Sequence, residues 1–278
     1  MEAITPRDRE ILRNLAKEQL EAAHSPKNAA ILKKWQAQAG GRRESPTVRL
    51  LFSNFTHEVI TPRMRCSGES ARELEAALLS TMTGRTLFDD DTPISPTFDI
   101  RWDTWVKPFG LEPHLTRPQM ENPQGYHIDP VIEDLESEIH RLRGGSFGVD
   151  REKTRARAAL AQDTFGDILP VRMVMDSLTG PMTSPMVFLM GMENYYCSLY
   201  DCPDQVHEAM DMACTVYENF YDFLEREGLL LPTNGISPIC QESFAFTDEL
   251  PTENVTKTTQ CWGILVSQET TGVLPETF

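Results

Sequence analysis

The chain has 278 residues, of which 42 are acidic and 26 are basic, and its formal net charge is −16. This balance argues against a nucleic-acid-binding protein, because phosphate backbones are held by clustered lysine and arginine side chains. No stretch approaches the ~18 uninterrupted apolar residues of a membrane span. The six scattered cysteines and the charged N-terminus, which lacks a signal peptide, favour free thiols in the cytoplasm. We therefore expect a cytoplasmic globular protein that binds neither nucleic acid nor membrane.

The first part of the chain predicts helices. Thr5 is a capping residue followed by proline, and apolar residues then recur at helical spacing. A second, short helix is expected before the glycine pair Gly40-Gly41 and a basic, proline-ended linker. We therefore divide the chain into an N-terminal helical segment, 1–45, and a main domain, 46–278.

The main domain opens with short elements. Residues 48–53 and 58–61 predict strands, and 67–80 predicts a helix with one apolar face. The bulky residues of 98–106 predict another strand. Further elements are expected as helices over 129–142, 150–162 and 203–228, and as strands over 229–231 and 262–266.

The central stretch is 165–183, with the sequence FGDILPVRMVMDSLTGPMT. An apolar run in it is closed by turn residues and followed by a helical pattern, which is typical of a buried strand that feeds a helix. Parallel sheets and barrels are built from such βα units. We therefore take 165–199 as the key βα unit, and function is expected near its ends.

Two sets of residues invite a metal hypothesis. The acidic triplet Asp89–Asp91 could bind a cation, but a solvated turn is favoured because consecutive acids point in different directions. Cys197, Cys202 and His207 are regularly spaced, but Pro203 places the two cysteines in different elements. The sequence therefore assigns no metal ligands.

Alternating strands and helices in the second half predict a parallel α/β architecture, whose sites collect at the carboxyl ends of strands. The polar residues that this rule places near such a rim are Asp176, Asn234, Gln241, Glu242, Gln268 and Glu269. For any one of them alone, helix capping or loop solvation is the simpler explanation. The candidate substrate-binding residues are Arg172, Asp176, Gln241, Glu242, Gln268 and Glu269.

Several motifs resemble the uroporphyrinogen decarboxylase superfamily. Residues 165–169, FGDIL, are similar to the FSDIL signature, and 180–183, GPMT, are similar to the GP-aromatic-T turn. Residues 202–207, CPDQVH, resemble the family's next landmark, a helix that begins Pro-Glu and contains a histidine. TDELP at 247–251 and WGILVSQE at 262–269 resemble a divergent branch from anaerobes, which is grouped with cobalamin-dependent methyltransferases. Three motifs in register are more specific than any one of them.

The resemblance implies a (β/α)8 barrel of the TIM type, with an N-terminal extension that is helical or α+β, and with Asp167 as the catalytic acid. It implies methyl transfer between a corrinoid and a thiol or related acceptor, with zinc and a corrinoid (cobalamin) as cofactors and a tetrapyrrole or corrinoid protein as partner. The alternative is porphyrinogen decarboxylation, in which the acid stabilises positive charge on a pyrrole ring. The absence of the family's arginine-rich carboxylate-binding motif disfavours that alternative.

The C-terminal end of the sequence adds a third alternative. A full barrel needs ~250 residues, and the family's late histidine and its His-x-Cys zinc ligands would lie beyond Phe278. We therefore expect a barrel that is incomplete at its C-terminus and whose sheet edge is left open, or is paired in a homo-oligomer or with a complementing chain. Such a chain could be a non-catalytic remnant or a partner-binding subunit.

Overall fold

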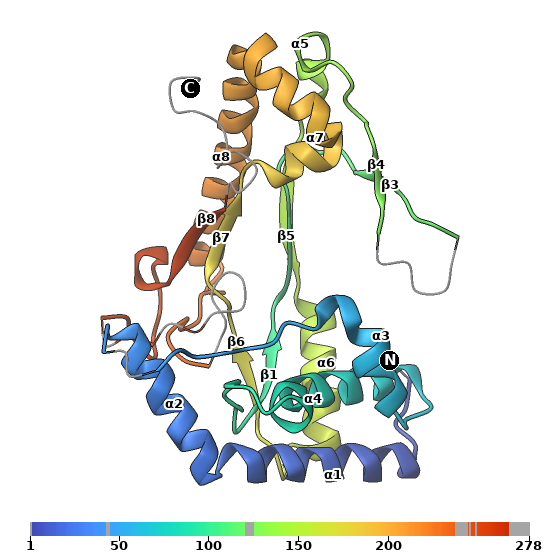
Figure 1. Ribbon diagram of the computed structural model, residues 1–278, viewed down its shortest axis with the longest axis vertical. Coiled ribbons are helices and arrows are strands. Elements are labelled where there is room, and N and C mark those ends of the chain that lie inside the picture. Colours follow the sequence, from blue (N-terminus) through green and yellow to red (C-terminus); the bar gives the residue numbers. More distant parts are fainter. Residues whose placement is uncertain are drawn as a thin grey trace.

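The computed structural model describes residues 2–42, 45–119, 125–236, 244, 246–247 and 249–266, and its fold is α/β (Figure 1). The helices are α1 (Pro6–Ala23), α2 (Pro26–Ala39), α3 (Thr56–Val59), α4 (Glu69–Leu87), α5 (Leu135–Glu138), α6 (Arg151–Phe165), α7 (Ser184–Asp201) and α8 (Pro203–Arg226). The strands are β1 (Phe98–Arg101), β2 (Asp103–Lys107), β3 (His114–Thr116), β4 (His127–Asp129), β5 (Ser146–Asp150), β6 (Val171–Val174), β7 (Leu178–Pro181) and β8 (Gly263–Val266). Short 3-10 turns are η1 (Ser53–Phe55), η2 (Thr61–Arg63), η3 (Ile139–Arg141) and η5 (Thr258–Gln260). None of the helices in these ranges is long and apolar enough to cross a membrane.

The described strands pair two by two. β1 is parallel to β6 and β7 is parallel to β8, whereas the pairs β2–β5 and β3–β4 are antiparallel. The α/β expectation is confirmed. A closed (β/α)8 barrel is not formed by the strands in the described ranges.

Two strands change partner where they bend. Residues 98–107 do not form one strand, because the chain bends at Trp102, so that β1 pairs with β6 and β2 pairs with β5. β6 likewise ends at Val174, and after residues 175–177 the chain continues as β7, paired with β8. The two segments diverge beyond the paired residues Arg101 and Val174 (Figure 1). We call this divergence, at Trp102 and 175–177, the strand fork.

Three helices, α1, α4 and α6, form a core against one face of the β1–β6 pair (Figure 1). Leu12 and Leu78 are fully buried in it, and the rings of Phe98 and Phe165 meet edge to face with centroids 5.1 Å apart. The N-terminal helix α1 therefore shares one core with the main-domain strands.

α1 is joined to α4 by a buried carboxylate. α1 begins as predicted, with the Thr5 hydroxyl accepting a hydrogen bond from the Asp8 backbone N–H at 3.1 Å. The Asp8 carboxylate is fully buried and accepts hydrogen bonds from the backbone N–H groups of Ser67, at 3.1 Å, and Gly68, at 3.2 Å. Burial alone would raise the pKa of Asp8, but these hydrogen bonds outweigh it and lower that pKa.

A second core lies between α7, α8 and the segment around α5 (Figure 1). The helix expected at the end of the unit 165–199 is present as the methionine-rich α7, and Met186 and Met190 are fully buried in this core. Most of its apolar surface is therefore covered within the chain, although Met192 and Tyr200 remain exposed. Gly191 interrupts the helix with a φ of 75°, a left-handed conformation that glycine adopts without strain.

Several sequence-based predictions of local structure are wrong. Residues 48–53 and 58–61 form no strand, and the chain there has η1, α3 and η2. The helix expected over 129–142 is reduced to α5 and η3, and 229–231 is not a strand. Apolar residues alone do not make a strand, because a strand also needs a partner edge.

The acidic triplet is not a solvated turn throughout. The exposed Asp89 forms an ion pair with Lys27, and the partly buried Asp91 forms one with Lys34. Asp90 is buried, however, and its carboxylate accepts hydrogen bonds from nearby backbone N–H groups, including that of Leu50 at 3.0 Å. It holds the loop that leads to β1.

Truncating Phe165 tests the first core. We expect Phe165→Ala to lower the free energy of unfolding by about 3–5 kcal/mol, because it removes a fully buried ring and leaves a cavity. Urea denaturation followed by circular dichroism measures the change. Phe55→Ala is the control, since that ring is 56% exposed and its loss should cost only about 0.5 kcal/mol. Equal costs would contradict the core described above.

The C-terminal end of α8 predicts a pH dependence. Glu225 accepts hydrogen bonds from Lys257 and from the Thr258 backbone, both at 2.8 Å, and these lower its pKa from 4.5 to about 2. Because the folded-state pKa is depressed, the resulting stabilisation is present above pH 4.5 and is lost as the pH falls towards 2. The urea midpoint of Glu225→Gln should therefore lie below that of the unchanged protein at pH 6, and the difference should shrink in acid. The control Glu10→Gln should show no such convergence.

Candidate functional site

One face of the β1–β6 pair carries charge. Phe98 and Ile100 point into the core, so strand alternation places Asp99 and Arg101 on the opposite face. Arg172 of β6 is the register partner of Asp99, and its guanidinium lies 3.1 Å from that carboxylate. Parallel strands are usually buried on both faces, so a charged face on such a pair is a candidate for function.

A second charge pair joins the carboxyl ends of the two strands. Arg101 ends β1, and its Nε and Nη2 atoms lie 2.6 and 2.8 Å from the two carboxylate oxygens of Asp176, which follows β6. The side chains are 45% and 42% exposed, so the pair contributes little to stability. Its bidentate geometry nevertheless fixes both groups at the mouth of the strand fork.

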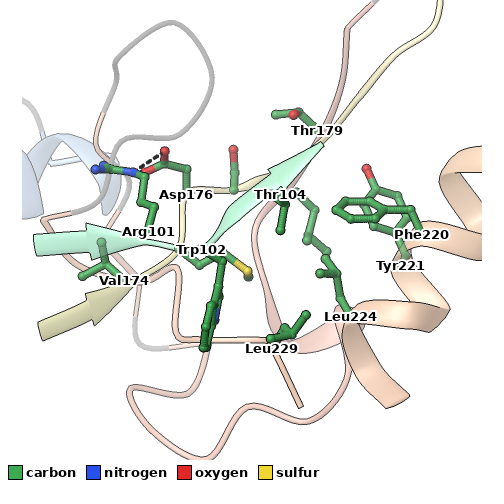
Figure 2. A pocket seen from close by; sticks show the side chains of 13 residues that line it. Arg101, Trp102, Thr104, Val174, Asp176, Thr179, Phe220, Tyr221, Leu224 and Leu229 are labelled. Atoms are coloured by element: carbon green, nitrogen blue, oxygen red, sulfur yellow. Dashed lines mark hydrogen bonds and ion pairs between the residues drawn. The ribbon is translucent and has the colours of Figure 1, made fainter. Parts of the chain in front are cut away.

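The strand fork contains a cavity of about 180 Å³. Figure 2 shows Arg101 and Asp176 facing each other on one side and side chains of α8 on the other. The α8 side of the cavity is mainly apolar. It is lined by Phe220, Tyr221 and Leu224 of α8 and by Leu229, which follows the helix. Burial raises the pKa of Tyr221 to about 12, so its phenol stays protonated at neutral pH.

Two buried polar atoms beside this cavity have no hydrogen-bond partner among the described residues: the indole Nε1 of Trp102 and the hydroxyl of Ser177. Ser177 is only 8% exposed. A buried polar group without a partner costs about 1–3 kcal/mol, and such groups are rare in folded proteins. A ligand with acceptor atoms would satisfy both groups.

The structure places two of the candidate substrate-binding residues, Arg172 and Asp176, on the charged face and at the fork. Asn234 instead holds a loop, and its side-chain oxygen accepts a hydrogen bond from the Thr247 backbone at 2.9 Å. The remaining candidates fall outside the described residues, and they are Gln241, Glu242, Gln268 and Glu269.

Asp167 lies at the other end of β6. It precedes the strand, its side chain is 64% exposed, and both of its oxygens contact the Arg13 guanidinium of α1, at 2.6 and 2.7 Å. This pairing lowers the pKa of Asp167, so it is a charged surface carboxylate. Its catalytic role stays a prediction. Asp167 lies at the opposite end of β6 from the strand fork, where the candidate Asp176 lies.

The described residues offer no metal site, and two of their cysteines stay protonated. No three histidine, cysteine, aspartate or glutamate side chains in them lie so that they could hold a metal ion. Zinc therefore does not fit these residues. Burial raises the pKa of Cys66 to about 12 and that of Cys261 to about 11, so neither is a thiolate at neutral pH.

The sequence-based interpretation overlooked Asp99, Arg101, Trp102 and Ser177. A signal was present, because the polar residues Thr97, Asp99 and Arg101 alternate with apolar ones along the strand. That pattern is typical of a strand with one polar face, and it places Asp99 and Arg101 together on that face.

The unpartnered hydroxyl gives a stability test. Ser177→Ala should leave the free energy of unfolding unchanged or raise it by up to ~2 kcal/mol, since it removes an unsatisfied buried group. The matched variant is Thr154→Val, because the buried Thr154 hydroxyl donates to Asp150 and accepts from the Asp103 N–H at 3.0 Å. Thr154→Val should destabilise the protein in urea denaturation. Equal destabilisation by both variants would show that Ser177 has a partner.

Comparison of the chain with protein-family models, with curated proteins and with solved structures found no match in any of the three. The resemblance to uroporphyrinogen decarboxylases therefore rests on the sequence motifs alone. The family assignment stays a prediction, and any function has to be argued from the strand fork and its residues.

Proposed function

We propose that the chain acts in methyl transfer between a corrinoid and a thiol or related acceptor, and that the acceptor binds in the strand fork. The observation that carries the proposal is the fork cavity, which lies at the carboxyl ends of parallel strands β1 and β6 and contains unpartnered buried donors. Ligands of α/β proteins bind at such strand ends. The motif resemblance supplies the reaction class.

We also propose that the described strands belong to a barrel of the (β/α)8 type. The support is the one-sided covering of β1–β6, with helices α1, α4 and α6 on the apolar face and charged side chains on the other. In a barrel of this type helices surround the sheet, and the opposite face points to the interior. The charged residues would then line that interior.

The size of the cavity favours methyl transfer over porphyrinogen decarboxylation. Its volume of about 180 Å³ is below the ~300–1,000 Å³ of pockets that enclose drug-sized ligands. A small thiol can enter it, whereas a tetrapyrrole macrocycle cannot be enclosed. In this proposal the corrinoid approaches the mouth of the fork on a separate corrinoid protein.

The fork residues would bind and orient the acceptor. A corrinoid, when bound, supplies the transferable methyl group. Arg101 would bind an anionic end of the acceptor in competition with Asp176, while Ser177 and Trp102 donate hydrogen bonds. The apolar α8 wall excludes water from the cavity, which strengthens these polar contacts.

Demethylation of methylcobalamin by 3-mercaptopropionate, followed by absorbance, tests the proposal. Arg101→Gln should slow the reaction about tenfold, since a charge-assisted hydrogen bond contributes about 1.5–3 kcal/mol. The effect should be smaller with neutral 2-mercaptoethanol. Arg9→Gln is the matched control, because Arg9 forms a similar exposed pair with Asp163 away from the fork.

Two outcomes of this assay, and one of a separate decarboxylase assay, would count against the proposal. The first is no demethylation above the protein-free rate, and the second is equal rates for Arg101→Gln and Arg9→Gln. The third is release of carbon dioxide from uroporphyrinogen by the same protein, which would favour the decarboxylase alternative.

A partner-binding subunit is the second candidate function. It is favoured by the strand pairs, since in the described part of the chain every sheet has only two strands and thus two open edges. Pairing with a second copy or a complementing chain would cover those edges. Light scattering after gel filtration should then show an oligomer, and a clean monomer would count against completion by a second copy.

A further inference from the structure

We propose that a second cleft, beside the strand fork, binds a small molecule through a carboxylate or phosphate group. The cleft has a volume of about 350 Å³ and lies between α4, α6, β1 and the loop that precedes β1. We call it the arginine cleft, and the residues that define it are Arg49, Ser80, Thr97, Arg101 and Arg157. The proposal does not depend on methyl transfer.

The charge of the arginine cleft is opposite to that of the chain. The net charge of the protein is −16, but three arginines line this cleft, from three separate segments, and one of them, Arg101, is already paired with Asp176. Asp99 is the single acid among the lining residues that the structure describes, and its carboxylate contacts Arg172, 3.1 Å away. Local positive charge in a concave site attracts and concentrates anions.

Donors for an anion remain available. The hydroxyls of Thr81 and Thr92 donate to the Ala77 carbonyl and to Asp90, so these threonines offer only lone pairs. Arg157, by contrast, forms no ion pair or hydrogen bond within the described ranges. Ser80 forms none there either, and both residues line the cleft. An oxyanion could therefore accept from both without breaking an existing contact.

A neighbouring cavity directs an anion towards the cleft. Arg157 and Ser80 also line a space of about 860 Å³ whose other residues include Glu2, Glu69 and Glu73. Lys153 lines it too, but its ammonium group is paired with Asp103 at 2.6 Å. The glutamate carboxylates would repel an anion, so the favourable position lies on the cleft side of Arg157.

The arginines also indicate the class of ligand. A guanidinium presents a planar fork of N–H donors that matches a carboxylate or a phosphate. The Arg49 guanidinium stacks over the Phe244 ring, 4.7 Å from its centroid, which orients its plane at the cleft. The volume suits a small organic acid or phosphate ester.

Isothermal titration with inorganic phosphate and with citrate tests the inference, and glycerol serves as the neutral probe. We expect saturable binding of at least one anion, weakened by added sodium chloride, and no binding of glycerol. Arg157→Gln should weaken anion binding about tenfold. Arg155→Gln is the matched control on the same helix, because Arg155 is also exposed but does not line the cleft; its effect should be under about twofold.

The inference is overturned if neither anion binds saturably, or if Arg157→Gln and Arg155→Gln weaken binding equally. A second variant, Arg49→Gln, guards against an effect of Arg157→Gln on folding, and it should also weaken binding. The titrations contain neither corrinoid nor thiol, so their failure is distinguishable from failure of the methyl-transfer proposal. Arg157→Gln should leave demethylation of methylcobalamin unchanged, because Arg157 does not line the fork cavity.

Discussion

The parallel pairing of β1 with β6 is the constraint on which the rest of the structure depends. It brings together segments that are more than 70 residues apart in the chain and fixes their register, Phe98 against Val171 and Arg101 against Val174. Because the register is fixed, Phe98, Ile100 and Met173 face the helices, whereas the charged Asp99, Arg101 and Arg172 face away. A shift by one residue would bury the charged Asp99 and Arg101 side chains in the core. The loss of folding free energy would far exceed the stabilisation that a surface ion pair provides.

The strand fork follows from the end of that pairing. A pair of parallel strands can continue side by side, but here each finds a new partner, β5 for one and β8 for the other. The backbone of Asp103 is tied to α6 through the Thr154 hydroxyl, which helps to turn β2 away. The space left between the diverging chains is filled only in part by α8, and the remainder is the cavity (Figure 2). Strand pairing and helix packing thus shape the candidate site together.

The sequence predicts those parts of the fold that depend on local signals. The cap at Thr5 and the proline that follows it fix the start of α1, and the apolar stripe after Pro203 gives α8 almost to its end. The strand predicted at 48–53 is wrong, because whether a partner strand is available depends on the tertiary fold and leaves no local signal. For the site, Arg172 and Asp176 could be named as rim residues, but their partners Asp99 and Arg101 could not. Those contacts depend on a strand pairing that the sequence does not reveal.

The buried carboxylate of Asp8 has a consequence for the limits of the folding unit. It satisfies the backbone N–H groups of Ser67 and Gly68 just where α4 begins. A protein shortened to start after Asp8 would leave both N–H groups without this acceptor, at the N-terminal end of a helix that packs against the same core as β1. The first turn of α1 thus belongs to the same core as the strands. Removing it as if it were a flexible tail would weaken the packing that holds β1, and with it the candidate site.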